Sequence, residues 1–115
     1  MKQLEDIQLT HNQTQALDQL GQLLLDQFDV EAVILYGSVA RGEADKESDL
    51  DLLVVTKRPF SSRFARHAIT DLVFQVNLRY GTNLSALVVD RETWGTGMMS
   101  VLPLYDEILQ EGVLL

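Results

Sequence analysis

The sequence has no cysteine, few cations and no long apolar run, and each of these absences excludes a class of protein. Without cysteine among its 115 residues, the chain has no disulfide framework and no thiolate metal site, which fits a reducing cytosol. No apolar run approaches the roughly 20 residues of a membrane span, and the N-terminus is polar. We therefore expect a cytoplasmic protein with no membrane partner.

Positive charge is scarce, since nine Lys and Arg residues stand against 17 Asp and Glu, for a formal net charge of −8. Such a balance repels a polyanion and argues against broad nucleic-acid binding. The two histidines, His11 and His67, are far apart and have no carboxylate beside them at metal-ligand spacing, so we expect them on solvated helix faces. A basic protein partner or a metal-bound nucleotide fits the charge better.

The length predicts one domain over residues 1–115, and 46% hydrophobic with 23% charged residues is ordinary for a globular chain. Apolar spacing predicts a helix at about 10–28 that begins with a capping box, a second from Ser61 or Ser62 to Gly81, and a last one between Ser100 and Gly112. Residues 1–9 are expected to be a loosely docked lead-in. Asp90 is expected to cap the irregular or weakly helical segment that follows it.

Three short apolar segments predict strands, at about 32–36, 49–56 and 84–89. The first two are joined too tightly for a long crossover, so we expect them to pair antiparallel, whereas a helical crossover makes the third parallel to the second. The expected fold class is α/β (α+β), in the order helix-strand-turn-strand-helix-strand-helix, with a small mixed β-sheet.

A Gly-Ser turn stands between the first two predicted strands. Gly37 lets the backbone approach a ligand closely, and Gly37 with Ser38 can offer N–H groups and a hydroxyl to a phosphate. The pair by itself favours an ordinary strand-ending turn over a phosphate site, because such short motifs are common.

Two aspartates begin the second predicted strand. Asp49 and Asp51 are two residues apart, so they point the same way in a strand that is otherwise apolar. Like charges on one face of such a strand are costly unless a cation lies between them, and carboxylates are the ligands that Mg²⁺ prefers. An exposed strand start is the alternative, and it accounts for Asp49 better than for Asp51, which leucines flank.

Together these features resemble the signature of the DNA polymerase β-like nucleotidyltransferase superfamily, in which a Gly-Ser turn is followed after about ten residues by Asp-x-Asp. The matching run is GSVARGEADKESDLDLLV, in which Val39 to Ser48 separate Ser38 from Asp49. The short length resembles the minimal nucleotidyltransferase (MNT) antitoxins that pair with HEPN-domain ribonuclease toxins.

The resemblance implies a nucleotidyltransferase fold and a Mg²⁺-dependent transfer of AMP from ATP to a HEPN toxin, which neutralises the toxin. It implies that Gly37 and Ser38 hold the triphosphate and that the catalytic Asp49 and Asp51 bind Mg²⁺. Arg41 is expected to neutralise phosphate charge, and a salt bridge to Glu43 or Asp45 is the alternative.

The sequence departs from the catalytic members of the family, which place a third carboxylate near the start of the next core strand. Here that position offers the neutral residues Asn83 or Ser85, Asp90 lies too far along the strand, and Asp71 is within a helix. A weakened or inactive protein that neutralises its partner by stoichiometric binding is therefore an alternative. Transfer of the nucleotidyl group to a small molecule is a further alternative. It would call for a homo-oligomer to build the acceptor pocket.

Overall fold

The computed structural model describes residues 1–43, 49–60 and 63–115. Along the chain it has the elements β1 (Lys2–Gln3), η1 (Leu4–Asp6), α1 (His11–Gln27), β2 (Val30–Tyr36), β3 (Leu50–Thr56), α2 (Arg63–Tyr80), β4 (Leu84–Asp90), α3 (Arg91–Gly95), η2 (Met98–Val101), α4 (Pro103–Glu111) and β5 (Val113–Leu114).

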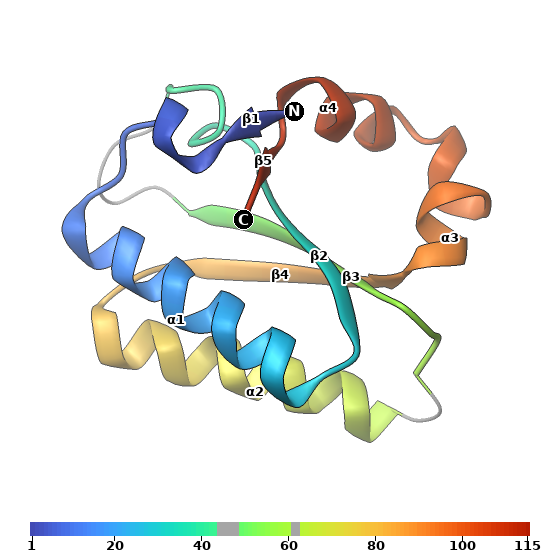
Figure 1. Ribbon diagram of the computed structural model, residues 1–115, viewed down its shortest axis with the longest axis horizontal. Coiled ribbons are helices and arrows are strands. Elements are labelled where there is room, and N and C mark those ends of the chain that lie inside the picture. Colours follow the sequence, from blue (N-terminus) through green and yellow to red (C-terminus); the bar gives the residue numbers. More distant parts are fainter. Residues whose placement is uncertain (44–48, 61–62) are drawn as a thin grey trace.

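The strands form one mixed sheet in the order β1-β5-β2-β3-β4 (Figure 1). Strands β2 and β3 pair antiparallel and β3 and β4 pair parallel, which confirms both predictions from the connection lengths. At the other edge, β5 pairs antiparallel with β2 and parallel with β1. The first and last residues of the chain therefore lie close together on one side of the sheet.

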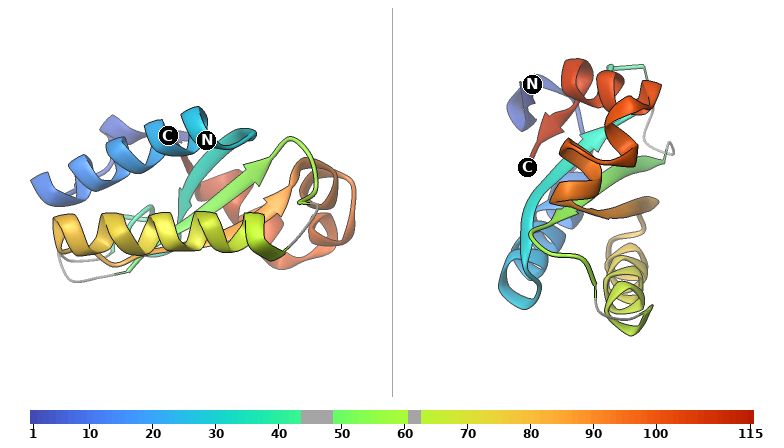
Figure 2. Two further views of the ribbon diagram at one scale, coloured as in Figure 1. Left: turned by 90° about the horizontal axis from the view of Figure 1, so that it is seen from below. Right: turned by 90° about the vertical axis from the view of Figure 1, so that its right-hand side faces the viewer.

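The two faces of the sheet are covered by different helices. Helices α1 and α2 lie side by side (Figures 1 and 2) and pack on one face, against residues such as Leu50, Leu52 and Val54 of β3. On the opposite face Leu53 and Val55 pack with residues of α3 and α4. Because side chains alternate along a strand, Asp51 belongs to this second face, which it shares with α4.

The helix boundaries follow local chemistry. In the capping box of α1, the Gln13 N–H donates to the Thr10 hydroxyl at 3.1 Å and the Thr10 N–H donates to the Gln13 side chain at 2.9 Å. Helix α2 ends at Gly81, which has a φ of 66°. The predicted opening of α2 at Ser61 or Ser62 lies outside the described residues. None of the helices in the described ranges is long and apolar enough to cross a membrane.

Two predictions about the ends of the chain were wrong. Residues 1–9 are not a loose lead-in, because Lys2 and Gln3 pair with β5 and η1 follows them. Ser100 does not cap the last helix, since its hydroxyl donates to the Gly97 carbonyl at 2.7 Å within η2. Helix α4 begins instead at Pro103, whose fixed φ and missing N–H suit the first helical position.

Candidate functional site

The site begins with the turn that ends β2. Gly37 has a φ of 83°, a conformation that side-chain-bearing residues rarely adopt. The Gly37 carbonyl accepts from the Arg41 N–H at 3.2 Å, and the Ser38 carbonyl accepts from the Glu43 N–H at 2.9 Å. These bonds close the turn over residues 37–43 that follows β2. The Nζ of Lys2 also donates to the carbonyl of Ala40 at 2.9 Å, so β1 fastens the turn to the sheet edge.

A row of polar side chains crosses the sheet beside this turn. Asp51 pairs with Tyr36 on one neighbouring strand and with Ser85 on the other, so the three residues are in register across β2, β3 and β4. Residues in register on paired strands project on the same face of the sheet. Asp49 stands two residues before Asp51, just ahead of β3, and is exposed, whereas Asp51 is half-buried. The predicted aspartate pair is therefore next to the Gly-Ser turn.

Gly37 and Asp51 are in direct contact range. A Cβ added at Gly37 would lie 2.6 Å from Oδ2 of Asp51, a distance that real Cβ contacts essentially never show. The turn can thus approach the carboxylate only because position 37 has no side chain. The structure brings together the predicted phosphate-binding turn and one predicted metal-binding carboxylate, although the sequence separates them by more than ten residues.

The electrostatic surroundings of the row are negative. Burial raises the pKa of Asp51, and the nearby carboxylates of Asp49 and Glu107 raise it further. Burial, Asp51 and Glu107 also raise the pKa of Tyr36. A bound cation would relieve this unfavourable concentration of charge, so the site suits a metal ion on electrostatic grounds.

The donor set fits Mg²⁺ that is shared with a substrate. The oxygens of Asp49 and Asp51 are suitable ligands, and within the described ranges no three His, Cys, Asp or Glu side chains gather into a group that could hold a metal. Mg²⁺ often binds through one or two carboxylates and completes its octahedron with waters and substrate phosphates. The residues present therefore fit a nucleotide-bound metal better than a permanently enclosed one.

Arg41 is held by carboxylates from two parts of the chain. Its Nε lies 3.2 Å from Oε2 of Glu43, and its Nη1 lies 2.9 Å from Oε1 of Glu107 and 3.5 Å from Oε2 of Glu111. Of the two salt bridges that the sequence suggested for Arg41, the one to Glu43 is formed, whereas Asp45 lies outside the described residues. Arg41 remains beside the turn, and its guanidinium connects the turn to α4.

Sequence reasoning missed Tyr36 and Glu107 as members of the site. Tyr36 reads as the last residue of an apolar strand, and Glu107 as one of several acidic positions on an exposed helix. Glu107 reaches the site only because β5 returns to pair with β2 and thereby sets α4 against the second face of the sheet. No local sequence signal indicates that return.

The four residues considered for the third acidic position lie at different places in the structure, and two of them are near Asp51. Ser85 lies beside Asp51 in register, and the Asn83 carbonyl accepts from the Leu50 N–H at 2.9 Å at the start of the same strand pair. Both residues are exposed. Asp90 lies at the other end of β4, where it bonds Thr93 and caps α3 as predicted. Asp71 is exposed on α2, which packs on the opposite face.

Comparison with known proteins finds relatives of the chain by sequence. The sequence profile of the nucleotidyltransferase domain matches residues 15–90. A candidate protein adenylyltransferase of Methanocaldococcus jannaschii is 40% identical over 82 residues, which are 70% of this chain and 54% of that protein. A second candidate protein adenylyltransferase of that organism is 35% identical over 63 residues, or 55% of this chain and 57% of that protein. The matches thus span little more than half the length of these relatives.

Solved structures share the fold. A candidate nucleotidyltransferase from Sulfolobus solfataricus has a TM-score of 0.58 at 20% identity, covering 87% of this chain and 76% of its own. A toxin–antitoxin structure with AMP-PNP has a TM-score of 0.57 at 16% identity, covering 91% and 72%. The MntA–HepT toxin–antitoxin structure has a TM-score of 0.53 at 15% identity, covering 88% and 69%. The mixed sheet with its flanking helices is therefore the fold of these proteins.

Proposed function

Because the chain belongs to the nucleotidyltransferase domain family, we propose that it transfers AMP from Mg-ATP to a HEPN ribonuclease toxin and acts as the antitoxin of that toxin. The observation that carries this proposal is the contact between Gly37 and Asp51. It combines a turn able to approach a phosphate with a pair of carboxylates able to hold a divalent cation.

Each residue of the site has a role in this reaction. Asp49 and Asp51 hold Mg²⁺, which when bound neutralises phosphate charge and stabilises the attacking and departing oxygens. The backbone of Gly37 and the hydroxyl of Ser38 bind phosphate oxygens. Arg41 adds positive charge at the edge of the turn, shared with the carboxylate of Glu107.

The transfer is an in-line displacement at the α-phosphorus. An acceptor hydroxyl oxygen forms the new P–O bond, the bond to the β-phosphate breaks, and pyrophosphate leaves with the electron pair. The hydroxyl proton goes to solvent or to a group of the acceptor protein, since Ser85, beside Asp51, is a poor base. Positioning and charge neutralisation supply most of the rate enhancement.

The comparisons support the acceptor class. The relatives are named for adenylyl transfer to protein, and two of the structural neighbours are toxin–antitoxin proteins, one of them with AMP-PNP. The chain's net charge of −8 is better suited to a protein acceptor than to a nucleic acid. To act on a ribonuclease of the cytoplasm, the protein would itself be cytoplasmic.

The test is intact-mass analysis of a candidate HEPN-domain toxin after incubation with this protein and Mg-ATP. We expect the mass of one or more AMP groups to be added, and expect no addition with Asp49→Asn or Asp51→Asn. Asp71→Asn is the matched control, because Asp71 is exposed on the helix that covers the other face. An unmodified partner that is nevertheless neutralised would contradict the proposal.

One observation favours a second function, stoichiometric neutralisation without catalysis. The position in register with Asp51 on β4 is a serine, so the site lacks a carboxylate on that side. A purely binding antitoxin would neutralise its partner without ATP, and Asp49→Asn and Asp51→Asn would leave neutralisation intact. Loss of neutralisation in those variants, with unchanged partner binding, would exclude this second function.

A further inference from the structure

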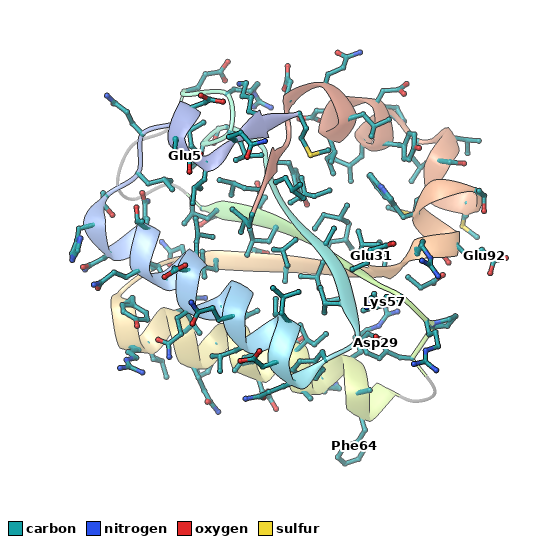
Figure 3. The ribbon with its side chains drawn as sticks, in the orientation of Figure 1. Glu5, Asp29, Glu31, Lys57, Phe64 and Glu92 are labelled. Carbon is teal, nitrogen blue, oxygen red and sulfur yellow. The ribbon has the colours of Figure 1, made fainter. Side chains whose placement is uncertain are left out.

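The outer side of α2 carries a row of exposed residues at regular spacing. The row is spaced at intervals of three, four, three and four positions and consists of Phe64, His67, Asp71, Phe74 and Leu78. All five are exposed, and the apolar ones strongly so, at 88% for Phe64, 61% for Phe74 and 70% for Leu78. Figure 3 shows Phe64 projecting from the start of α2 away from the rest of the molecule. We call these five residues the α2 seam.

The seam lies opposite the face by which α2 packs on its own sheet. Ile69, Val73 and Val76 are buried at that inner face. Because an α-helix has about 3.6 residues per turn, intervals of three and four positions keep the seam on one side of the helix. This spacing is the pattern by which two helices pack along their length. In Figure 1, α2 forms the lower edge of the molecule, and within the described ranges the seam is open to solvent.

The flanks of the seam suit a second copy of the same helix. The residues beside it include Ala68, Thr70 and Gln75, which are exposed and uncharged. Asp71 is the only acidic residue of α2, although the chain has 17 Asp and Glu and a formal net charge of −8. Two copies can therefore bring these faces together without the like-charge repulsion that the net charge would otherwise cause.

An antiparallel arrangement makes the seam complementary to itself. When a two-fold axis passes beside Ile69, residues equally far before and after that position lie in the same layer of the contact. Phe64 then meets Phe74 of the second copy, which pairs two aromatic rings. His67 meets Asp71 of the second copy, and its ring N–H donates to that carboxylate. A parallel arrangement would instead set the two Asp71 carboxylates against each other.

We propose that α2 binds α2 of a second copy of this chain through the seam, with the two helices antiparallel. The contact involves one helix of each copy, which is a small interface, so the dimer forms reversibly and depends on protein concentration. The seam and the Asp51 row belong to opposite faces of the sheet, so both proposed transfer sites stay open in the dimer. AMP transfer therefore depends neither on the dimer nor on Asp71.

The test is sedimentation velocity of the full chain at micromolar to millimolar concentrations, where we expect a dimer. Asp71→Arg should weaken the dimer at least tenfold, because two hydrogen-bond donors then face each other. His67→Asp should weaken it similarly, because two carboxylates then face each other. The double variant with both changes should return to within threefold of the original chain, since opposite charges meet again. Asp18→Arg, the same charge change at an exposed position of α1, is the matched control and should leave dimerisation within twofold.

Disulfide crosslinking tests the direction of the helices, and the chain has no cysteine of its own to interfere. A mixture of Phe64→Cys and Phe74→Cys chains should form a linked dimer on mild oxidation. Either variant alone should link far less, because its two cysteines would be about 15 Å apart along the helices.

A chain that stays monomeric throughout this concentration range would overturn the proposal, since the seam would then be the docking face of a different protein. A dimer that Asp71→Arg leaves unchanged, or that the double variant fails to restore, would overturn it as well. Equal crosslinking in the mixture and in either variant alone would also contradict it, because the helices would then not be antiparallel in this register.

Discussion

The carboxylate of Asp51 occupies the space that a side chain at Gly37 would need, with Oδ2 only 2.6 Å from the position of such a Cβ. This relationship joins the end of β2 to the start of β3 and brings the turn that we propose to bind phosphate against a carboxylate that we propose to bind the metal. It also makes the site sensitive to small changes, because neither residue can be enlarged without displacing the other.

Gly37→Ala should lower both the stability of the chain and its rate of AMP transfer, for two different reasons. The positive φ alone makes the substitution destabilising by about 1–3 kcal/mol. The added methyl group also displaces the Asp51 carboxylate. A displacement of about 1 Å in an active site can lower activity by about 100-fold. Gly81→Ala is the matched control, since Gly81 has a φ of 66° and a Cβ there would meet no atom within 4 Å in the described ranges. Equal losses of AMP transfer in the two variants would contradict the role of Gly37.

Asp51→Asn should raise thermal stability at neutral pH. The pKa of Asp51 is raised by burial and by the charges of Asp49 and Glu107, so its ionised form is less favourable in the folded than in the unfolded chain. Stability from the protonated form is present below the unfolded pKa of about 3.9 and is lost as the pH rises through the folded pKa. The gain in Tm should be largest near pH 7 and disappear below about pH 4. Thermal melts of the original chain and of Asp51→Asn without divalent metal, at pH 7 and below about pH 4, measure this gain. An equal gain in Tm at the two pH values would contradict the prediction.

Ser85→Asp should strengthen the metal site. Ser85 is in register with Asp51, so a carboxylate there adds a third ligand beside the first two. Without metal, the extra like charge across the strands should lower Tm, and Mg²⁺ should restore it. AMP transfer should rise by at least tenfold, with Ser85→Asn as the uncharged control. A variant whose Tm does not respond to Mg²⁺ would show that Ser85 does not face the metal site.

Asp90→Ala should destabilise the chain by about 1 kcal/mol without affecting nucleotide binding, since Asp90 caps α3 at the far end of β4. Hydrogen bonds from the Thr93 hydroxyl and N–H lower the pKa of Asp90, so its contribution is present above about pH 4 and is lost as the pH falls through the folded pKa. Urea unfolding at pH 7 and pH 3 measures the difference. Asp90→Asn, which can still cap, should lose less, and a loss that does not depend on pH would contradict the account.

Much of the fold could be predicted from local pattern. The capping box at Thr10, the glycine that ends β2 and the helical crossover through α2 are local signals, so the three seven-residue strands β2, β3 and β4 and their directions could be predicted from sequence. The two short strands, β1 and β5, could not be predicted. Strands β1 and β5 have two residues each, and Lys2 with Gln3 shows no apolar alternation. They form because β5 pairs with the edge of β2 that β3 leaves free, and β1 then pairs with β5.

The site divides in the same way. Gly37, Ser38, Asp49 and Asp51 belong to one continuous run, and their spacing predicted both the turn and the carboxylate pair. Arg41 and Glu107 are 66 positions apart in the sequence, and their contact depends on the docking of α4, so nothing near either residue indicates it. The register of Ser85 with Asp51 likewise depends on how β4 pairs, although the predicted parallel direction made it one of the two possible positions.

The central claim is that the Gly37–Ser38 turn and the Asp49–Asp51 pair together hold a metal-bound nucleoside triphosphate. The most direct test is paramagnetic broadening of amide signals by Mn²⁺, added with a non-hydrolysable ATP analogue. We predict nucleotide-dependent broadening at residues 37, 38, 49, 51 and 85, little broadening near Asp90, and none of it in the Asp49→Asn, Asp51→Asn double variant. Broadening centred elsewhere, or unchanged in that variant, would contradict the account.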